Sequence, residues 1–148
     1  MQQRISLPKV APETYAAIRE LDATVRRGGL EQGLIELVKM RASQINGCAY
    51  CLNMHSADAR RHGETEQRLY LLNAWRETEL YSERERAALT WTECLTRLAI
   101  DGAPEAAYRA LEAHFSPAEI GDLTALIGVI NIWNRVAVGL ASPLPRAA

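Results

Sequence analysis

Two of the three cysteines in this 148-residue chain, Cys48 and Cys51, lie three positions apart directly after an Asn-Gly pair, and His55 follows four residues later. If a helix begins here, as we expect, the three side chains project from one face within an arc of roughly 60°. Thiols at this spacing can close into a disulfide, and the positive end of the helix dipole favours a thiolate. The pattern therefore predicts a redox-active dithiol with a histidine beside it.

Two neighbouring side chains could handle protons at such a dithiol. His55 could relay a proton to or from Cys51, one helical turn earlier. Tyr50, between the cysteines, could donate a hydrogen bond to a bound oxygen or hold a water. The position at the start of the helix favours Cys48 as the more reactive thiolate.

Zinc binding is the main alternative for the same residues, because two cysteines and a histidine offer three ligands on one face. The candidates for a fourth ligand are Cys94, His62 and His114. None of them belongs to a second pair with ligand-like spacing. We therefore predict no metal, and interpret Cys94 as a small core residue and the two histidines as groups near helix C-termini.

The elements that must position these residues are predicted to be helices, because apolar residues recur at three- and four-residue spacing without strand-like alternation. Glycine, proline and two capping boxes, Ser82 with Glu85 and Ser116 with Glu119, mark the helix ends. The expected helices cover residues 12–27, 30–45, 48–62, 65–74, 82–101, 104–114 and 117–140. The predicted fold class is all-α, with the cysteine motif at the N-terminus of a central helix.

Glu36 lies on the helix before the motif and can be interpreted in two ways. If helices 30–45 and 48–62 form an antiparallel hairpin, Glu36 lies about 16 Å and His55 about 12 Å from the turn, so the two stand at similar heights. A carboxylate there could deprotonate a thiol through a water or through His55. Periodicity argues against this, because Glu36 falls opposite the apolar stripe of its own helix and would then be a surface residue.

Composition limits the classes of protein that the chain could represent. At 148 residues it is expected to form a single domain over residues 1–148. Its 17 Lys and Arg against 18 Asp and Glu give a net charge of -1, which offers no electrostatic footprint for nucleic acid or an anionic membrane. No signal-peptide core and no apolar run of about 18 residues is found. We expect a cytoplasmic protein, and three cysteines fit a reducing compartment.

Three further features bear on packing. The helix over 117–140 is apolar around most of its circumference, so it must be buried on several sides, and we expect a homo-oligomer. The expected helix 12–27 has an apolar stripe that is interrupted only by Asp22. The segment 133–135 is interpreted as packing and subunit contact, and the first few residues and 142–148 as frayed tails.

The joint spacing of Glu36, Cys48, Cys51 and His55 resembles the signature of the AhpD-like alkylhydroperoxidases, within the carboxymuconolactone decarboxylase superfamily. The similarity continues through residues 85–93 and 131–135, and so covers about residues 15–140. It implies an all-helical AhpD-like domain that assembles as trimers or hexamers. The activity that it implies is thiol-dependent reduction of organic hydroperoxides, or of partner disulfides, in antioxidant defence.

The resemblance also implies roles for the site residues. Cys51 would attack the peroxide and become a sulfenic acid that Cys48 captures, with Glu36 and His55 as the proton relay. No cofactor is implied beyond the disulfide between the two cysteines, and the electron donor would be an external dithiol such as a lipoyl group or a thioredoxin-like protein. Some members have a histidine at the position of Tyr50, where proton transfer in this chain would run through a phenol or a water.

Two other functions remain open at this stage. A carboxymuconolactone-type decarboxylase, as elsewhere in the superfamily, would not rely on a cysteine pair. A non-catalytic helical oligomer that binds zinc or a protein would keep its thiols bound rather than free.

Overall fold

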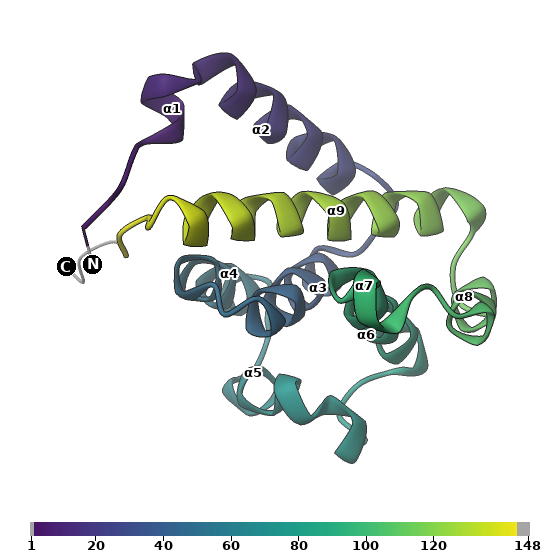
Figure 1. Cartoon of the computed structure of the whole chain (residues 1–148). Helices are drawn as coiled ribbons and strands as arrows, with labels where there is room; N and C mark the ends of the chain where they lie inside the picture. The colour runs from purple at the N-terminus through teal and green to yellow at the C-terminus, as the bar shows by residue number, and fades with distance from the viewer. Residues whose placement is uncertain (1, 145–148) are drawn as a thin grey trace.

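The computed structural model describes residues 2–144, and over these it contains helices and turns without a β-strand (Figure 1). The helices are α1 (Leu7–Val10), α2 (Pro12–Arg26), α3 (Gln32–Ile45), α4 (Ala49–Arg61), α5 (Glu66–Leu71), the 3-10 helix η1 (Leu72–Glu77), α6 (Glu83–Thr96), α7 (Leu98–Asp101), α8 (Glu105–Glu112) and α9 (Pro117–Gly139). The predicted all-α fold class is confirmed. No helix in this range is long and apolar enough to cross a membrane.

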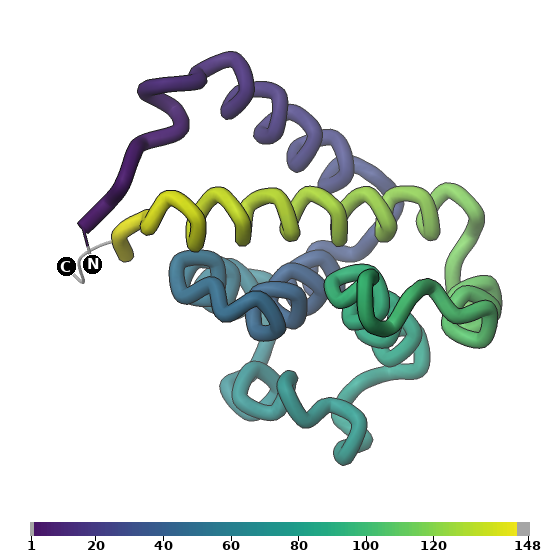
Figure 2. The backbone as a smooth tube through the Cα atoms, viewed as in Figure 1, coloured from purple at the N-terminus to yellow at the C-terminus, as the bar shows by residue number. Residues whose placement is uncertain are grey.

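The long helix α9 runs between two groups of helices, with α1 and α2 on one side and α3, α4, α6 and α7 on the other (Figure 1). α3 packs against α4, α6 and α9, and α2 packs mainly against α9. The tube in Figure 2 shows α1 and the segment before it turning back toward the end of α9. There the backbone N–H of Arg4 donates to the Leu140 carbonyl at 3.0 Å.

The helix bounds follow the predictions except at three places. The first residues, expected to be a frayed tail, include α1 and the bonded Arg4. The expected helix 65–74 is α5 followed by η1, with a kink at Ala74. The expected helix 82–101 is divided at Arg97, whose non-helical backbone separates α6 from α7. The tail prediction for 145–148 lies outside the described residues, and one domain over 1–148 stays a prediction.

Both capping boxes form as predicted. The Ser82 hydroxyl accepts from the Glu85 N–H and the Glu85 carboxylate accepts from the Ser82 N–H, and Ser116 and Glu119 do the same for α9. Each box satisfies two backbone donors that a helix start otherwise leaves free. The starts of α6 and α9 are thereby fixed by local sequence.

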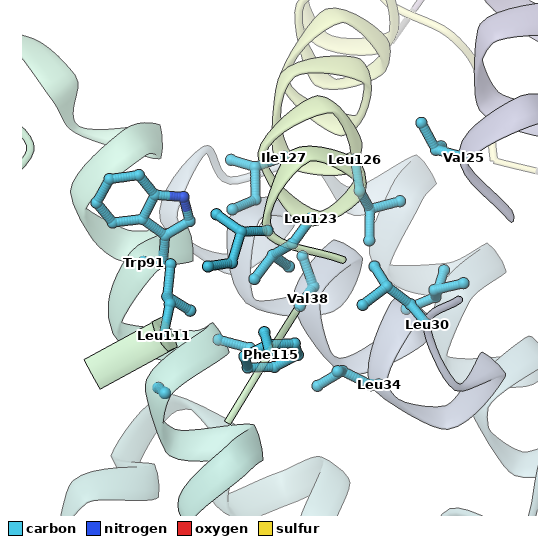
Figure 3. Packing of buried hydrophobic residues seen from close by; sticks show 14 of the residues in the cluster. Val25, Leu30, Leu34, Val38, Trp91, Leu111, Phe115, Leu123, Leu126 and Ile127 are labelled. Atoms are coloured by element: carbon cyan, nitrogen blue, oxygen red, sulfur yellow. The ribbon is translucent and has the colours of Figure 1, made fainter. Parts of the chain in front are cut away.

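The main core lies where α2, α3, α6, α8 and α9 meet (Figure 3). Its buried apolar side chains include Leu34 and Val38 of α3, Trp91 of α6 and Leu123 and Ile127 of α9. Burial of each such side chain contributes about 1.5–3 kcal/mol to folding. This core holds one side of α3, while α4 and α9 cover the others, so that every residue from 34 to 43 is buried.

Glu93 of α6 is a buried carboxylate that joins three elements. Its Oε1 accepts from Arg41 Nε of α3 at 2.8 Å and from Trp75 Nε1 of η1 at 2.9 Å, and its Oε2 accepts from Arg76 Nη1 at 2.5 Å. Burial raises the pKa of a carboxyl, but these donors outweigh it, so the pKa of Glu93 is lowered. The ion pairs attach η1 and α3 to α6.

Replacement of Glu93 by Ala is expected to destabilise the fold by about 3–5 kcal/mol, because Arg41 would be left buried without its carboxylate. The free energy of unfolding from urea titration measures this loss. Glu112→Ala on the exposed face of α8 is the matched control and should change it by less than about 0.5 kcal/mol. Equal stabilities of the two variants would contradict the assigned role of Glu93.

Candidate functional site

The dithiol is built at the turn between α3 and α4. Gly47 has φ 62°, a left-handed conformation that residues with a side chain rarely adopt. Cys48 follows as the N-cap of α4 with extended backbone, so it lies just before the helix that was predicted to begin with it. The N–H of Cys51, in the first turn, donates to Cys48 Sγ at 3.3 Å. Both cysteines are buried and free.

The two thiols have opposite pKa shifts. A hydrogen bond from the Cys51 thiol lowers the pKa of Cys48 to about 7, helped by the N–H groups of Cys51 and Tyr50. The pKa of Cys51 is raised, because its proton is held in that hydrogen bond and because the thiol is buried. The pair therefore shares one proton near neutral pH, with the negative charge on Cys48. The direction agrees with the expectation from its place at the helix start.

Two further polar side chains lie close to the thiols. Neither was assigned to the site from the sequence. Asn134 of α9 and Ser43 of α3 are buried, and Asn134 Nδ2 donates to Ser43 Oγ at 3.0 Å. Hydrogen bonds from Asn134 lower the pKa of both cysteines, and one from Ser43 lowers that of Cys51. An Asn on a mostly apolar helix was the available signal, but 133–135 had been interpreted as packing and subunit contact.

The structure brings Glu36 and His55 together. Glu36 Oε2 lies 2.7 Å from His55 Nδ1, and both side chains are buried. The surface interpretation of Glu36 is therefore wrong, because α3 is covered on the side opposite its apolar stripe as well. A carboxylate on Nδ1 fixes the proton there and leaves Nε2 as an acceptor. His55 can then act as a base toward the cavity.

A chain of alternating charges extends from this pair into α2. Glu36 Oε1 accepts from Arg26 Nη1 at 2.8 Å, and Arg26 Nε donates to Asp22 Oδ2 at 3.3 Å. Asp22 also pairs with Lys39, whose side chain is 1% exposed. Burial raises the pKa of Glu36, but His55 and Arg26 outweigh it and the pKa is lowered. For Lys39 burial dominates over Asp22, so its pKa is lowered.

These α2 residues were also missed by sequence reasoning. Asp22 was the one polar interruption of an apolar stripe, which was the signal that could have found the chain of charges. One of its partners, Lys39, lies on α3, so the interruption gave no hint of that contact.

A cavity of about 470 Å³ lies in front of the dithiol. Its walls come from the N-terminal segment, from α2, from α4 and from the end of α9. Cys51, His55 and Tyr50 line it, whereas Cys48 and Glu36 do not. The volume lies within the range of small-molecule sites. Of the two thiols, Cys51 is the one that a molecule in the cavity meets.

Metal binding by the cysteines finds no support in the geometry. Within residues 2–144, the three potential ligands whose atoms lie within 4.8 Å of one another are Glu36, His55 and Asp58. Both carboxylates already pair with arginines, Glu36 with Arg26 and Asp58 with Arg61 at 2.5 Å. Cys94, offered as a fourth zinc ligand, belongs to the apolar core.

Comparisons with known proteins give the family of the chain. Residues 12–93 match the model of the carboxymuconolactone decarboxylase family. The uncharacterized protein YdfG of Bacillus subtilis strain 168 is 37% identical over 142 residues, 96% of this chain and 97% of that protein.

Solved structures give the same result. A protein of unknown function from Agrobacterium tumefaciens is 45% identical with a TM-score of 0.95, over 99% of this chain and 100% of that one. A role as the antioxidant defence protein AhpD has been suggested for that protein. An uncharacterized peroxidase-related protein from Silicibacter sp. TM1040 is 28% identical with a TM-score of 0.78, over 92% of this chain and 72% of that one. The predicted resemblance to AhpD-like proteins is confirmed.

The shared proton of the dithiol leads to a titration experiment on the reduced Cys94→Ser protein. Thiolate absorbance at 240 nm should rise with an inflection at about pH 7, because Cys48 is a thiol below that pH and a thiolate above it. In Cys51→Ala the S–H donor is lost, so the inflection should move upward toward the ordinary value. A reduced protein that shows no inflection below pH 8.5, the pKa of an ordinary thiol, would contradict the assignment.

Proposed function

The chain belongs to the carboxymuconolactone decarboxylase family, and from that premise we propose that it reduces organic hydroperoxides, or the disulfide of a partner protein, with its own dithiol. The observation that supports this best is the pair of free, buried thiols that shares one proton and presents Cys51 to a cavity beside the paired His55 and Glu36. This combination supplies a nucleophile, a second thiol to resolve it and a base.

In the first step Cys51 Sγ attacks the distal oxygen of the hydroperoxide. The O–O bond breaks, the thiol is oxidised to a sulfenic acid and the alcohol leaves. His55 takes the Cys51 proton and delivers it to the leaving alkoxide, so no net proton is consumed. Glu36 stabilises the imidazolium that forms in between, and Arg26 keeps Glu36 ionised.

In the second step the Cys48 thiolate attacks the sulfenic sulfur. A disulfide forms between Cys48 and Cys51, and hydroxide leaves as water after it accepts a proton from the site. The low pKa of Cys48 suits this role, because the attacking thiol must be ionised at neutral pH. An external dithiol then reduces the disulfide, and we propose a lipoyl group or a thioredoxin-like protein as its class.

Tyr50 lies between the cysteines in the sequence, at a position where some relatives have a histidine, and its side chain lines the cavity. We assign its phenol to a hydrogen bond with the peroxide oxygen or with a water. We also propose a homo-oligomer, a trimer or hexamer. Ile132 and Val138 of α9 support it, because they remain exposed on the single chain.

The cysteines are tested by peroxide consumption with a dithiol donor. Cys48→Ser and Cys51→Ser should each abolish turnover, whereas Cys94→Ser should leave it unchanged because that thiol lies in the apolar core. Mass spectrometry after one equivalent of peroxide should find a disulfide between Cys48 and Cys51 in the wild type and a sulfenic acid on Cys51 in Cys48→Ser. Unchanged peroxide consumption by Cys51→Ser would refute the mechanism.

The relay is tested by Glu36→Gln and His55→Gln. Loss of a positioned base costs about 10²–10⁴-fold, so kcat/KM for the hydroperoxide should fall by about that factor in His55→Gln and by less in Glu36→Gln. Circular dichroism controls for folding. If the double Cys→Ser variant instead turned over a carboxylactone, the decarboxylase alternative would replace the proposal.

A further inference from the structure

The charged side chains around the cavity are almost all matched with one another. Asp22 pairs with Lys39 and Arg26, and Arg26 pairs with Glu36. Asp58, the other carboxylate on the wall, pairs with Arg61. These pairs hold as many positive as negative charges, so they offer a charged ligand no net attraction.

Arg19 is the exception on this wall. It lines the cavity from α2, and its guanidinium lies 6.0 Å from the centroid of the Tyr15 ring, while no carboxylate of residues 2–144 forms an ion pair with it. Arg27, directly after the end of α2, in contrast pairs with Glu20. A guanidinium without a carboxylate at the rim of a pocket is a ready site for an anionic group, which it binds with two parallel hydrogen bonds.

The cavity between Arg19 and the dithiol is largely apolar. The apolar side chains that line it include Ile5, Leu7, Met54, Trp133, Val136 and Leu140. Trp133 packs edge to face on Tyr15, with the ring centroids 5.6 Å apart. Ile5 and Met54 are about half exposed, so an apolar ligand would remove their surface from water.

The distance between the two ends sets the size of the ligand. Arg19 precedes Arg26 by seven residues, or roughly 10 Å along the helix at 1.5 Å per residue. Arg26 contacts Glu36, which in turn contacts His55 beside Cys51. A group bound at Arg19 is therefore two turns of α2 away from Arg26, the residue that holds Glu36 of the relay, with apolar wall between.

We propose that this cavity selects long-chain carboxylic acids that carry a hydroperoxide, with the carboxylate at Arg19, the hydrocarbon chain against Tyr15 and Trp133, and the hydroperoxide at Cys51. The proposal rests on the proposed function for its chemistry, but its recognition element is separate from the dithiol and its relay. Arg19 is then a specificity-determining residue.

The test compares linoleic acid hydroperoxide with its methyl ester, which keeps the chain and the peroxide but lacks the charge. The wild type should have a higher kcat/KM for the acid. Arg19→Gln should lower kcat/KM for the acid by about tenfold or more, because the charge-assisted hydrogen bonds to the carboxylate are lost, and leave the ester unchanged. Arg27→Gln, directly after the same helix but outside the cavity, is the control and should change neither.

Binding of oleic acid and methyl oleate, followed by tryptophan fluorescence, separates recognition from turnover. The proposal is supported if the wild type binds the acid more tightly than the ester and Arg19→Gln loses this difference. This holds even if neither hydroperoxide is reduced. In that case only the proposed function fails. The proposal would be overturned if the wild type bound acid and ester equally tightly, or if Arg19→Gln changed binding of the acid no more than Arg27→Gln does. Either result would overturn it even if both hydroperoxides are reduced.

Discussion

The burial of α3 on every side is the constraint on which the rest of the structure depends. Four of its buried residues, Glu36, Lys39, Arg41 and Ser43, carry polar or charged groups, and a buried charge without a partner costs several kcal/mol. Each group therefore requires a partner from another helix. Those partners come from α2, α4, η1, α6 and α9. The polar contacts of one helix thus set where five other elements must lie, and three of these contacts also build the site.

Much of this fold could be predicted from the sequence because helix ends are local. The two capping boxes, the glycine at 47 and the apolar spacing all act within a few residues, and each was found where expected. The turn of the segment before α1 could not be, because it depends on the contact of Arg4 with Leu140 at the other end of the chain. The dithiol and His55 share one helix, so their proximity also followed from spacing.

The partners of Glu36 show where such reasoning ends. Periodicity describes one face of a helix against one core, and it assigns the opposite face to solvent. α3 has a second covering layer on that opposite face, made of α4 and the charges of α2, which no pattern within residues 30–45 can report. Asn134 was missed for a related reason, since an amide on a mostly apolar helix acquires meaning only from the thiols that it faces. The catalytic roles of the five predicted residues remain predictions.

The N-terminal segment and the end of α9 close the cavity wall, joined by the bond from Arg4 to Leu140. Cys48, Cys51, His55 and Glu36, in contrast, lie within the single stretch 36–55. The cysteine motif and much of the cavity wall therefore belong to different segments of the chain. Substitutions near the two ends can change the shape of the cavity while the cysteine pair and the pair of Glu36 and His55 keep their contacts.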